Sequence, residues 1–369
     1  MVGALFTGAV ILGAEPSLFD RVATTDFAYI WAGPRAILEG ADPYDPVQWA
    51  RRTTDLITPV YSYPPPVALV LLPLALLPVT IAWLAWTVAG VAFAIAAVRA
   101  LTRTLAPGGT AVAAVAGFLL LGSRGSSATL LLGQATFLLT AALATTVVAM
   151  RTERVRTAGL SGLVLAAKPH LFAVALLAFG WAALRRGQGR ALVWFGATGG
   201  ALAVVSIALF PRGWATWLQT VPAARAGETG STTLVNAARD LGAPGLIAAV
   251  VVVGLLVAIV LRFDARTDAY LALWVALSLS AALYERFYDH LFLVVPVVIA
   301  VGVAARSSAA RARRTLLAAV VVLVAGTLAL VAIADLRGGF LSFYATVPPA
   351  VFVVVAVACW PRRRWRSSA

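Results

Sequence analysis

The sequence predicts an all-α membrane protein, a polytopic bundle of about twelve transmembrane helices. Of its 369 residues, 61% are hydrophobic and 12% are charged, whereas about 25% of the residues of a soluble domain are charged. Apolar runs such as 243–261 and 315–334 approach the ~20 residues that cross a hydrocarbon core of about 30 Å. The strict alternation of polar and apolar residues that marks an outer-membrane barrel is missing, so helices are expected.

Arginines give the chain its net charge of +14, and their distribution predicts its orientation. They gather in short segments between apolar runs, and 13 of them lie in 185–190, 262–267, 306–314 and 361–369. The positive-inside rule places these segments in the cytoplasm. The intervening segments hold only five arginines and are expected outside; they are 211–242, 284–289 and 335–343. No aromatic-interleaved basic patch is present, so nucleic acid is not an expected partner.

In this arrangement six crossings follow residue 190 and one precedes residue 20. The six are 191–210, 243–261, 269–283, 290–305, 315–334 and 344–360. The apolar residues 2–14 lack the basic start of a signal peptide, so they are interpreted as a first transmembrane helix extending to about Phe19. The polar segment 20–62 then lies outside.

The apolar sequence between residues 64 and 184 allows two topologies. It contains three apolar blocks: 64–98, 110–150 and 157–184. In chain order, these blocks must supply either two, two and one crossings or one, two and two crossings. The first assignment puts Arg99, Arg103 and the arginines of 151–156 outside, against the positive-inside rule. The second keeps them inside but requires half-length helices around Lys168-Pro169, because proline breaks or kinks a helix. Both give about twelve crossings in a single membrane domain, 1–369.

The external segment 20–62 carries the first candidate chemistry. Asp26 and Tyr29 precede an amphipathic stretch that reaches about Leu38, and Gly40 fits a helix stop. This pattern predicts a short helix lying on the membrane surface. A carboxylate at headgroup depth, directly after a transmembrane helix, suits a general base that acts on a lipid-linked substrate. The alternative is a solvated loop with interfacial aromatic residues.

Lys168 is the second candidate, because it is the only lysine of the chain and lies in an apolar stretch. Ionisable groups inside a membrane are costly and usually face a cavity or a partner. A cation at this position suits a lipid phosphate. The alternative is a lysine near a helix end that extends its ammonium group to the interface.

Three further groups have both functional and structural interpretations. Asp289 and His290 suit pairing with a partner or a phosphate, or Asp289 caps a helix. Gln134 binds a hydroxyl or joins two helices. The segment 211–242, which contains Asn236, is a loop that closes over a substrate or a plain connector. The sequence has no Walker loop, zinc-type Cys/His spacing, HExxH or GxSxG, so no cofactor is expected and no divalent metal is indicated.

Several short motifs, taken in order, resemble one family. They are Asp26-x-x-Tyr29 with Gly40 and Tyr44, Tyr63-Pro-Pro with Leu-Leu-Pro73 and Leu-Leu-Pro78, Leu132-Gly-Gln134, Lys168-Pro169 and Tyr288-Asp289-His290. Over roughly 20–300 the chain resembles the actinobacterial polyprenyl-phosphate-mannose-dependent α-mannosyltransferases of glycosyltransferase family 87, once catalogued as a domain of unknown function. It departs from the family in its short first helix and in 227–240, where Ser231 and Asn236 match the pattern only loosely.

The resemblance implies a fold similar to that of the GT-C glycosyltransferases, in the plasma membrane, with the active site at the outer face. It implies inverting transfer of a sugar from a polyprenyl phosphate to a cell-envelope glycolipid or polysaccharide. Asp26 matches the catalytic carboxylate of the family. The donor phosphate is assigned to Lys168, His290 and Arg286. Sugar and acceptor contacts are assigned to Tyr29, Tyr44, Tyr63, Gln134, Asn236 and Asp289.

Mannose is the first expectation for the transferred sugar. An enzyme that uses an arabinofuranosyl donor is one alternative. A lipid or solute transporter, with Lys168 as its substrate or coupling site, is the alternative from another class. The bias of the polar motifs to one side of the membrane and the lack of an inverted repeat favour the enzyme.

Overall fold

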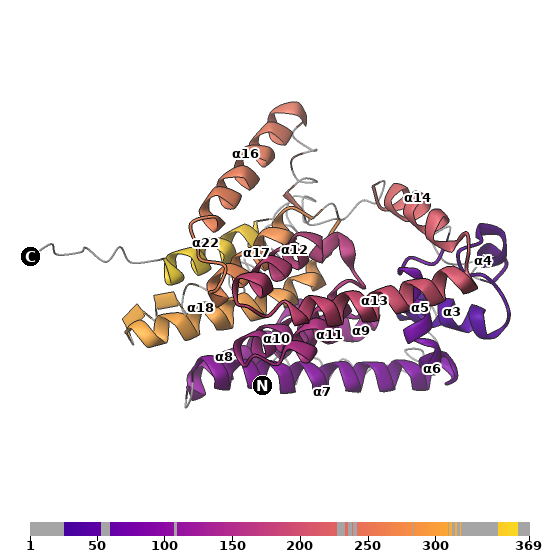
Figure 1. The fold of residues 1–369 in the computed structure, drawn as a ribbon, viewed down its shortest axis with the longest axis horizontal. Coiled ribbons are helices and arrows are strands. Elements are labelled where there is room, and N and C mark those ends of the chain that lie inside the picture. Colours follow the sequence, from indigo (N-terminus) through magenta and orange to yellow (C-terminus); the bar gives the residue numbers. More distant parts are fainter. Residues whose placement is uncertain are drawn as a thin grey trace, which may run out of the picture.

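In the computed structural model of the protein, every regular element of the described chain is a helix (Figure 1). The structure describes residues 26–52, 60–106, 109–226, 242–282, 284–308 and 346–360, with isolated positions at 233–234, 238, 310–311, 314–315 and 318. The prediction of an all-α chain is confirmed for these residues. The predicted helix before residue 20 and nearly all of the predicted crossing at 315–334 lie outside them.

The short helix predicted in the first external segment is present. α3 (Asp26–Leu38) carries Asp26 in its first turn, where a carboxylate interacts favourably with the helix dipole. The helix stops before Gly40, whose φ of 74° is the left-handed conformation that glycine adopts without strain. Three shorter helices follow, each with proline in its first turn: α4 (Pro46–Arg52), α5 (Pro65–Val70) and α6 (Leu72–Ala75).

α7 (Val79–Leu105) is a single long helix. Its 27 residues extend about 40 Å at 1.5 Å per residue, enough to cross a bilayer once. α8 (Thr110–Gly122) and α9 (Arg124–Leu132) then run in the opposite direction as a pair bent by 47°. At the bend, the Ser123 hydroxyl accepts the backbone N–H of Ser126 and caps α9. α10 (Thr136–Arg151) follows and packs along α7.

The pair α11 (Val155–Leu165) and α12 (Pro169–Arg185) decides between the two predicted topologies. Arg151 precedes α11, Arg186 follows α12, and both bind the carboxylate of Asp268. The segment between the two arginines therefore leaves one end of the bundle and returns to it. This agrees with the second assignment, in which half-length helices meet at Lys168-Pro169. We call the end defined by Arg151, Arg186 and Arg306 the arginine end.

The described residues of the second half follow the predicted crossings closely. Its helices are α13 (Arg190–Leu209), α14 (Gly213–Ala226), α16 (Gly242–Val260), α17 (Asp268–Ser280), the 3₁₀ helix η2 (Phe287–Leu293), α18 (Val294–Ser307) and α22 (Val347–Cys359). The first part of the predicted loop 211–242 is helical instead, as α14. The indole Nε1 of Trp217 donates to the carbonyl of Ser62 at 2.9 Å and ties α14 to the first external segment.

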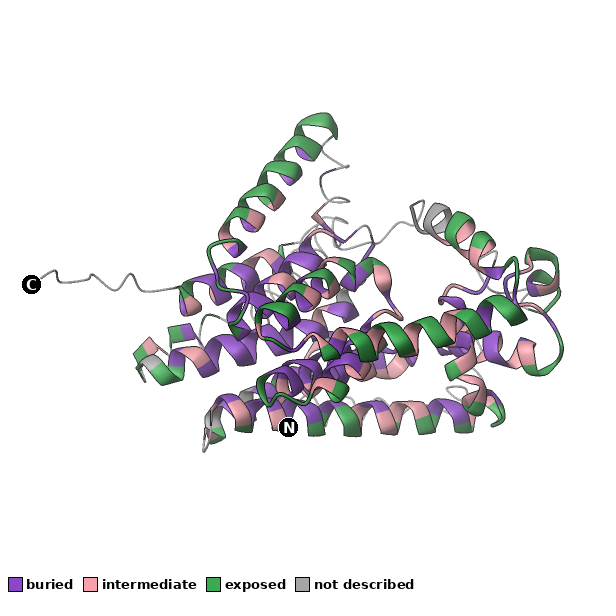
Figure 2. Ribbon diagram, in the orientation of Figure 1, coloured by how far each residue is buried: buried purple, intermediate pink, exposed green. Residues whose placement is uncertain are grey.

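Burial separates an inner layer of helices from an outer one (Figure 2). In the span 288–306, which includes α18, 83% of the most apolar window is buried, against 6% in α13 and 22% in α16. Both outer helices nevertheless expose large apolar side chains, such as Val204 and Val250. Helices that are apolar on an exposed face fit a lipid environment. The protein is therefore a helical membrane protein.

Four described helices are long and apolar enough to cross a membrane, or five if the bent pair α8–α9 counts as one span. Shorter apolar helices, α10, α12, α17 and α22 among them, complete the bundle. The total of about twelve crossings stays a prediction. The close approach of α11 to α13 depends on Gly159, because a Cβ there would lie 2.3 Å from the carbonyl oxygen of Ala191.

Candidate active site

Four polar side chains from distant parts of the sequence form one connected chain of contacts. Gln134 Nε2 donates to Asp26 Oδ2 at 2.5 Å, and Lys168 Nζ donates to Gln134 Oε1 at 3.3 Å. Lys168 Nζ also forms an ion pair with Asp289 Oδ1 at 2.8 Å. A carboxylate and an ammonium group therefore lie at opposite ends of one side-chain amide. We call these four residues the site cluster.

Local structure at helix ends positions these residues. Lys168 is the N-cap residue of α12, at the turn between α11 and α12, and Pro169 occupies the first turn of α12, where its missing N–H costs nothing. Gln134 follows Gly133, which ends α9 with a φ of 65°. A Cβ on Gly133 would lie 2.5 Å from the Cβ of Phe27. Glycine at this position therefore lets α9 approach α3, which brings Gln134 to Asp26.

Asp289 is the buried counterion of Lys168. Its Oδ1 also accepts the hydroxyl of Thr136 at 3.4 Å, and its Oδ2 accepts the backbone N–H of Arg286 at 3.2 Å. The side chains of Lys168 and Asp289 are 8% and 2% exposed. Two buried charges are tolerated when they pair and form further hydrogen bonds. Asp289 forms two further hydrogen bonds, and Lys168 also donates to Gln134. Asp289 thus fixes the lysine ammonium in position.

Aromatic rings border the site cluster. The ammonium of Lys168 lies 5.2 Å from the centroid of the Tyr288 ring, an attractive cation–π contact. The Tyr288 phenol is near enough to Asp26 and Tyr63 to interact with them electrostatically. The start of α3, the segment just before α5 and the 3₁₀ helix η2 are thereby brought to the same place.

Comparison with known families identifies the class of protein to which this site belongs. The profile of glycosyltransferase family 87 matches residues 61–333, nearly three quarters of the chain. The chain belongs to glycosyltransferase family 87. No curated protein and no solved structure matches it. The resemblance identified from the motifs is confirmed, and the protein is a membrane glycosyltransferase. Gln134, Lys168 and Asp289 lie within the matched residues, whereas Asp26 precedes them and joins them through the fold.

A second buried pair of the glycosyltransferase lies beside the site cluster. His290 Nε2 is 3.2 Å from Glu285 Oε1, and the carboxyl group of Glu285 is completely buried. Burial raises the pKa of Glu285 well above its ordinary value, the charge of Asp289 raises it further, and that of Lys168 opposes the shift. The raised pKa favours the protonated form of Glu285 over a wider range of pH than for an exposed glutamate.

Arg286 and His170 lie at the edge of the site cluster. Arg286 Nε donates to the hydroxyl of Tyr284 at 2.5 Å, and the guanidinium carbon lies 5.3 Å from the ring centroid of the same tyrosine. The exposed ring of His170 lies 6.0 Å from that ring. Tyr284 therefore contacts two basic side chains: Arg286, which is close in sequence to Asp289, and His170, which is close in sequence to Lys168.

The predicted tyrosines have different environments. Tyr44 is 1% exposed, and its hydroxyl donates to the carbonyl of Tyr63 at 3.0 Å. Its ring packs in an aromatic cluster with Tyr61, Trp49 and Phe210. Tyr29 and Tyr63 are half-buried and border this cluster. Tyr44 thus holds the first external segment together, and its predicted contact with a sugar stays a prediction.

The structure brings most of the predicted site residues together. Asp26, Gln134, Lys168 and Asp289 are connected, and Arg286, His290 and Tyr63 are their neighbours; Asn236 lies outside the described residues. Thr136 and Glu285 were not singled out from the sequence, although each lies within four residues of a predicted site residue. Among the described residues, no group of three His, Cys, Asp or Glu side chains could hold a metal ion.

Proposed function

We propose that the protein transfers a sugar, with mannose as the first candidate, from a polyprenyl-phosphate donor to a cell-envelope glycolipid or glycan, with inversion. The observation that carries this proposal is the arrangement of the Asp26 carboxylate and the Lys168 ammonium at the two ends of the Gln134 amide. A base for the acceptor and a cation for the leaving phosphate are thereby held side by side. Family membership supplies the reaction class.

Asp26 is the general base of the proposed reaction. The acceptor oxygen forms a bond to the anomeric carbon of the sugar while its proton passes to Asp26, a step that contributes typically 10²–10⁴-fold in rate. Gln134 holds one carboxylate oxygen of Asp26. A carboxylate has a second oxygen available to accept the proton. Gln134 thus orients the base.

Lys168 is the proposed partner of the donor phosphate. As the bond between the anomeric carbon and the phosphate oxygen breaks, polyprenyl phosphate leaves with an additional negative charge. An ammonium group has three donors, and Gln134 and Asp289 accept two of those of Lys168. The third donor and the positive charge stabilise the leaving phosphate in an environment where water is scarce. Arg286, at the edge of the site, and His290, in the buried pair beside it, are proposed to assist.

The depth of the site suits an amphiphilic donor. α10 has Thr136 of the site at its first residue and Arg151 of the arginine end at its last, 16 residues that extend about 24 Å. In a hydrocarbon core of about 30 Å, the site lies close to the headgroups opposite the arginine end. With the arginine end in the cytoplasm, the proposed site faces the outside of the plasma membrane.

The test is Asp26→Asn in reconstituted membranes supplied with labelled polyprenyl-phosphate mannose and, separately, polyprenyl-phosphate arabinofuranose. We expect kcat to fall at least about 100-fold with the preferred donor, with little change in KM, because asparagine keeps the contact with Gln134 but accepts no proton. Asp45→Asn is the matched control, since this half-buried carboxylate lies in the same segment and asparagine preserves its helix cap. Transfer at the wild-type rate by folded Asp26→Asn protein excludes Asp26 as the base.

A further inference from the structure

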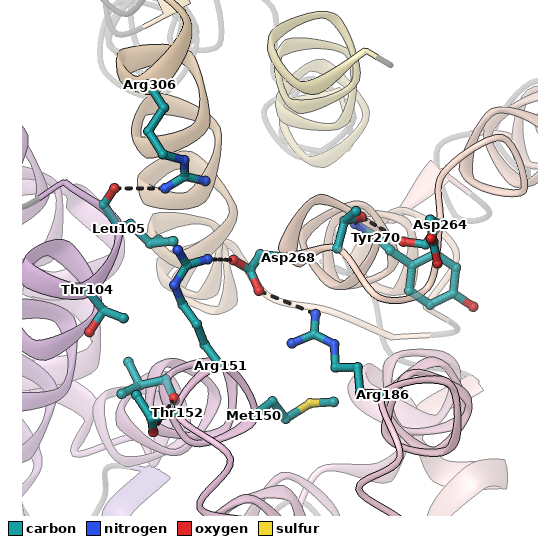
Figure 3. Close-up of polar contacts among 12 residues, drawn as sticks. Thr104, Leu105, Met150, Arg151, Thr152, Arg186, Asp264, Asp268, Tyr270 and Arg306 are labelled. Atoms are coloured by element: carbon teal, nitrogen blue, oxygen red, sulfur yellow. Dashed lines mark hydrogen bonds and ion pairs between the residues drawn. The ribbon is translucent and has the colours of Figure 1, made fainter. Parts of the chain in front are cut away.

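A second polar cluster lies at the arginine end, remote from the site (Figure 3). Asp268, in the first turn of α17, is the common partner of two arginines. It pairs with Arg151 at the end of α10, and its Oδ1 lies 3.3 Å from Nη2 of Arg186 at the end of α12. The Asp268 side chain is 7% exposed. Three helices therefore converge on one buried carboxylate.

A third arginine extends toward the same place. Arg306, near the end of α18, donates through Nη1 to the carbonyl of Leu105 at 2.9 Å (Figure 3). It is near enough to Arg151 and Asp268 to interact with both electrostatically. Two guanidinium groups thus pair with the Asp268 carboxylate, and a third lies near it. Among the described residues the cluster carries an excess of positive charge, which is unfavourable in a partly desolvated place unless an anion compensates it.

The cluster also has hydrogen-bond donors available for an anion. The Arg186 side chain is 9% exposed, and its Nε is buried without a hydrogen-bond partner among the described residues. Buried polar groups are almost always hydrogen-bonded, so an orphaned donor indicates a missing partner. Arg151 and Arg306 are more accessible than Arg186, so the cluster is open to a ligand from their side.

We propose that Arg151, Arg186 and Arg306 form a binding site for a phosphate-bearing anion, supplied by the membrane as the headgroup of an anionic phospholipid. The planar guanidinium group matches phosphate oxygens in geometry and remains charged at every physiological pH. Basic sites between transmembrane helices at headgroup depth are suited to such lipids. The bound phosphate neutralises the excess charge and joins the ends of α10, α12 and α18.

Native mass spectrometry of the full-length protein tests the proposal. The protein is extracted in a mild detergent and titrated with phosphatidylglycerol, phosphatidylcholine or sodium phosphate. We expect specific retention of phosphatidylglycerol and a higher unfolding temperature with this lipid than with phosphatidylcholine. If sodium phosphate stabilises the protein as strongly as the lipid, the site is an anion site for soluble phosphate. Equal retention of the two lipids, with no effect of phosphate, overturns the proposal.

Arg306→Gln is the main variant, because it removes a charge but leaves the pairs of Asp268 intact. We expect about fivefold weaker binding of phosphatidylglycerol. Arg262→Gln is the matched control, since Arg262 is exposed and lies at the same end between α16 and α17. An equal loss in both variants shows that diffuse charge, not a site, attracts the lipid. Asp268→Asn removes the competing carboxylate and is expected to tighten binding; weaker binding by folded protein contradicts the site.

Discussion

The two polar clusters lie at opposite ends of the same helices and are opposite in composition. α10 carries Thr136 of the site at one end and Arg151 at the other; α12 is preceded by Lys168 and followed by Arg186. At the site, Asp26, Glu285 and Asp289 lie near Lys168 and Arg286. At the arginine end, Asp268 pairs with Arg151 and Arg186, and Arg306 lies near this pair of contacts (Figure 3).

The difference shows how each cluster is suited to a different ligand. In the proposed function, Asp26 of the acid-rich site takes up a proton and the site accepts a phosphate. Two of its acids carry little free charge, because Asp289 is paired with Lys168 and burial favours the neutral form of Glu285. The arginine end has no comparable compensation among the described residues. We infer that the arginine end is suited to bind an anion permanently, whereas the site cluster is suited to bind one transiently.

The largest expected effect is that of Lys168→Ala. It leaves the buried carboxylate of Asp289 without its cation, so we expect a loss of about 3–5 kcal/mol in the free energy of unfolding and loss of transfer. Chemical denaturation in detergent and a transfer assay on the folded fraction measure the two effects.

A double variant separates stability from function at the site. Lys168→Met with Asp289→Asn removes both charges. The amide oxygen of asparagine can accept the backbone N–H of Arg286, and its NH2 group can donate to the hydroxyl of Thr136. We expect it to regain most of the stability lost in Lys168→Ala but none of the transfer. Recovery of transfer together with stability means that Lys168 has only a structural role.

Arg186→Gln is the counterpart at the arginine end. We expect it to lower the free energy of unfolding less than Lys168→Ala does. Asp268 keeps its pair with Arg151, so we expect a loss of about 1–3 kcal/mol, the value of one hydrogen-bonded charge. Transfer by the folded protein should continue, because Arg186 and Lys168 lie at opposite ends of α12, about 27 Å apart at 1.5 Å per residue. The same two assays apply. A defect in transfer larger than the loss of folded protein contradicts the functional separation of the clusters.

The smallest effect on stability is expected for Glu285→Gln, and the size of this effect depends on pH. The pKa of Glu285 is raised in the folded protein above its ordinary value of 4.5, so its contribution to stability is fully present below that value and is lost as pH rises through the folded pKa. Glutamine imitates the protonated carboxyl group and removes this dependence. The unfolding temperature of the wild type should therefore fall relative to the variant between pH 5 and 8. Parallel curves for the two proteins show that Glu285 is not neutral in the fold.

Much of the architecture could be predicted from the sequence because its causes are local. Apolar length predicted α13 and α16 almost to the residue, and Gly40 predicted the end of α3. Lys168 could be singled out because burying a charged lysine in an apolar stretch is energetically costly in a membrane. Short motifs identified the family. Neither the helical content of 213–226 nor the choice of topology between residues 64 and 184 followed from local signals.

Pairing between distant residues was decided by the tertiary structure alone. Asp26 and Gln134 are 108 residues apart, and Lys168 and Asp289 are 121 apart, so no local pattern relates them. Asp289 was predicted to contact sugar or acceptor, and only the fold shows it paired with Lys168. Likewise, Asp268 selects the topology by binding Arg151 and Arg186 together. The sequence determines which segments enter the membrane, because burial of apolar length is a local property. Which buried charges meet depends on how those segments pack, because a charge buried in one helix must find its counterion on another.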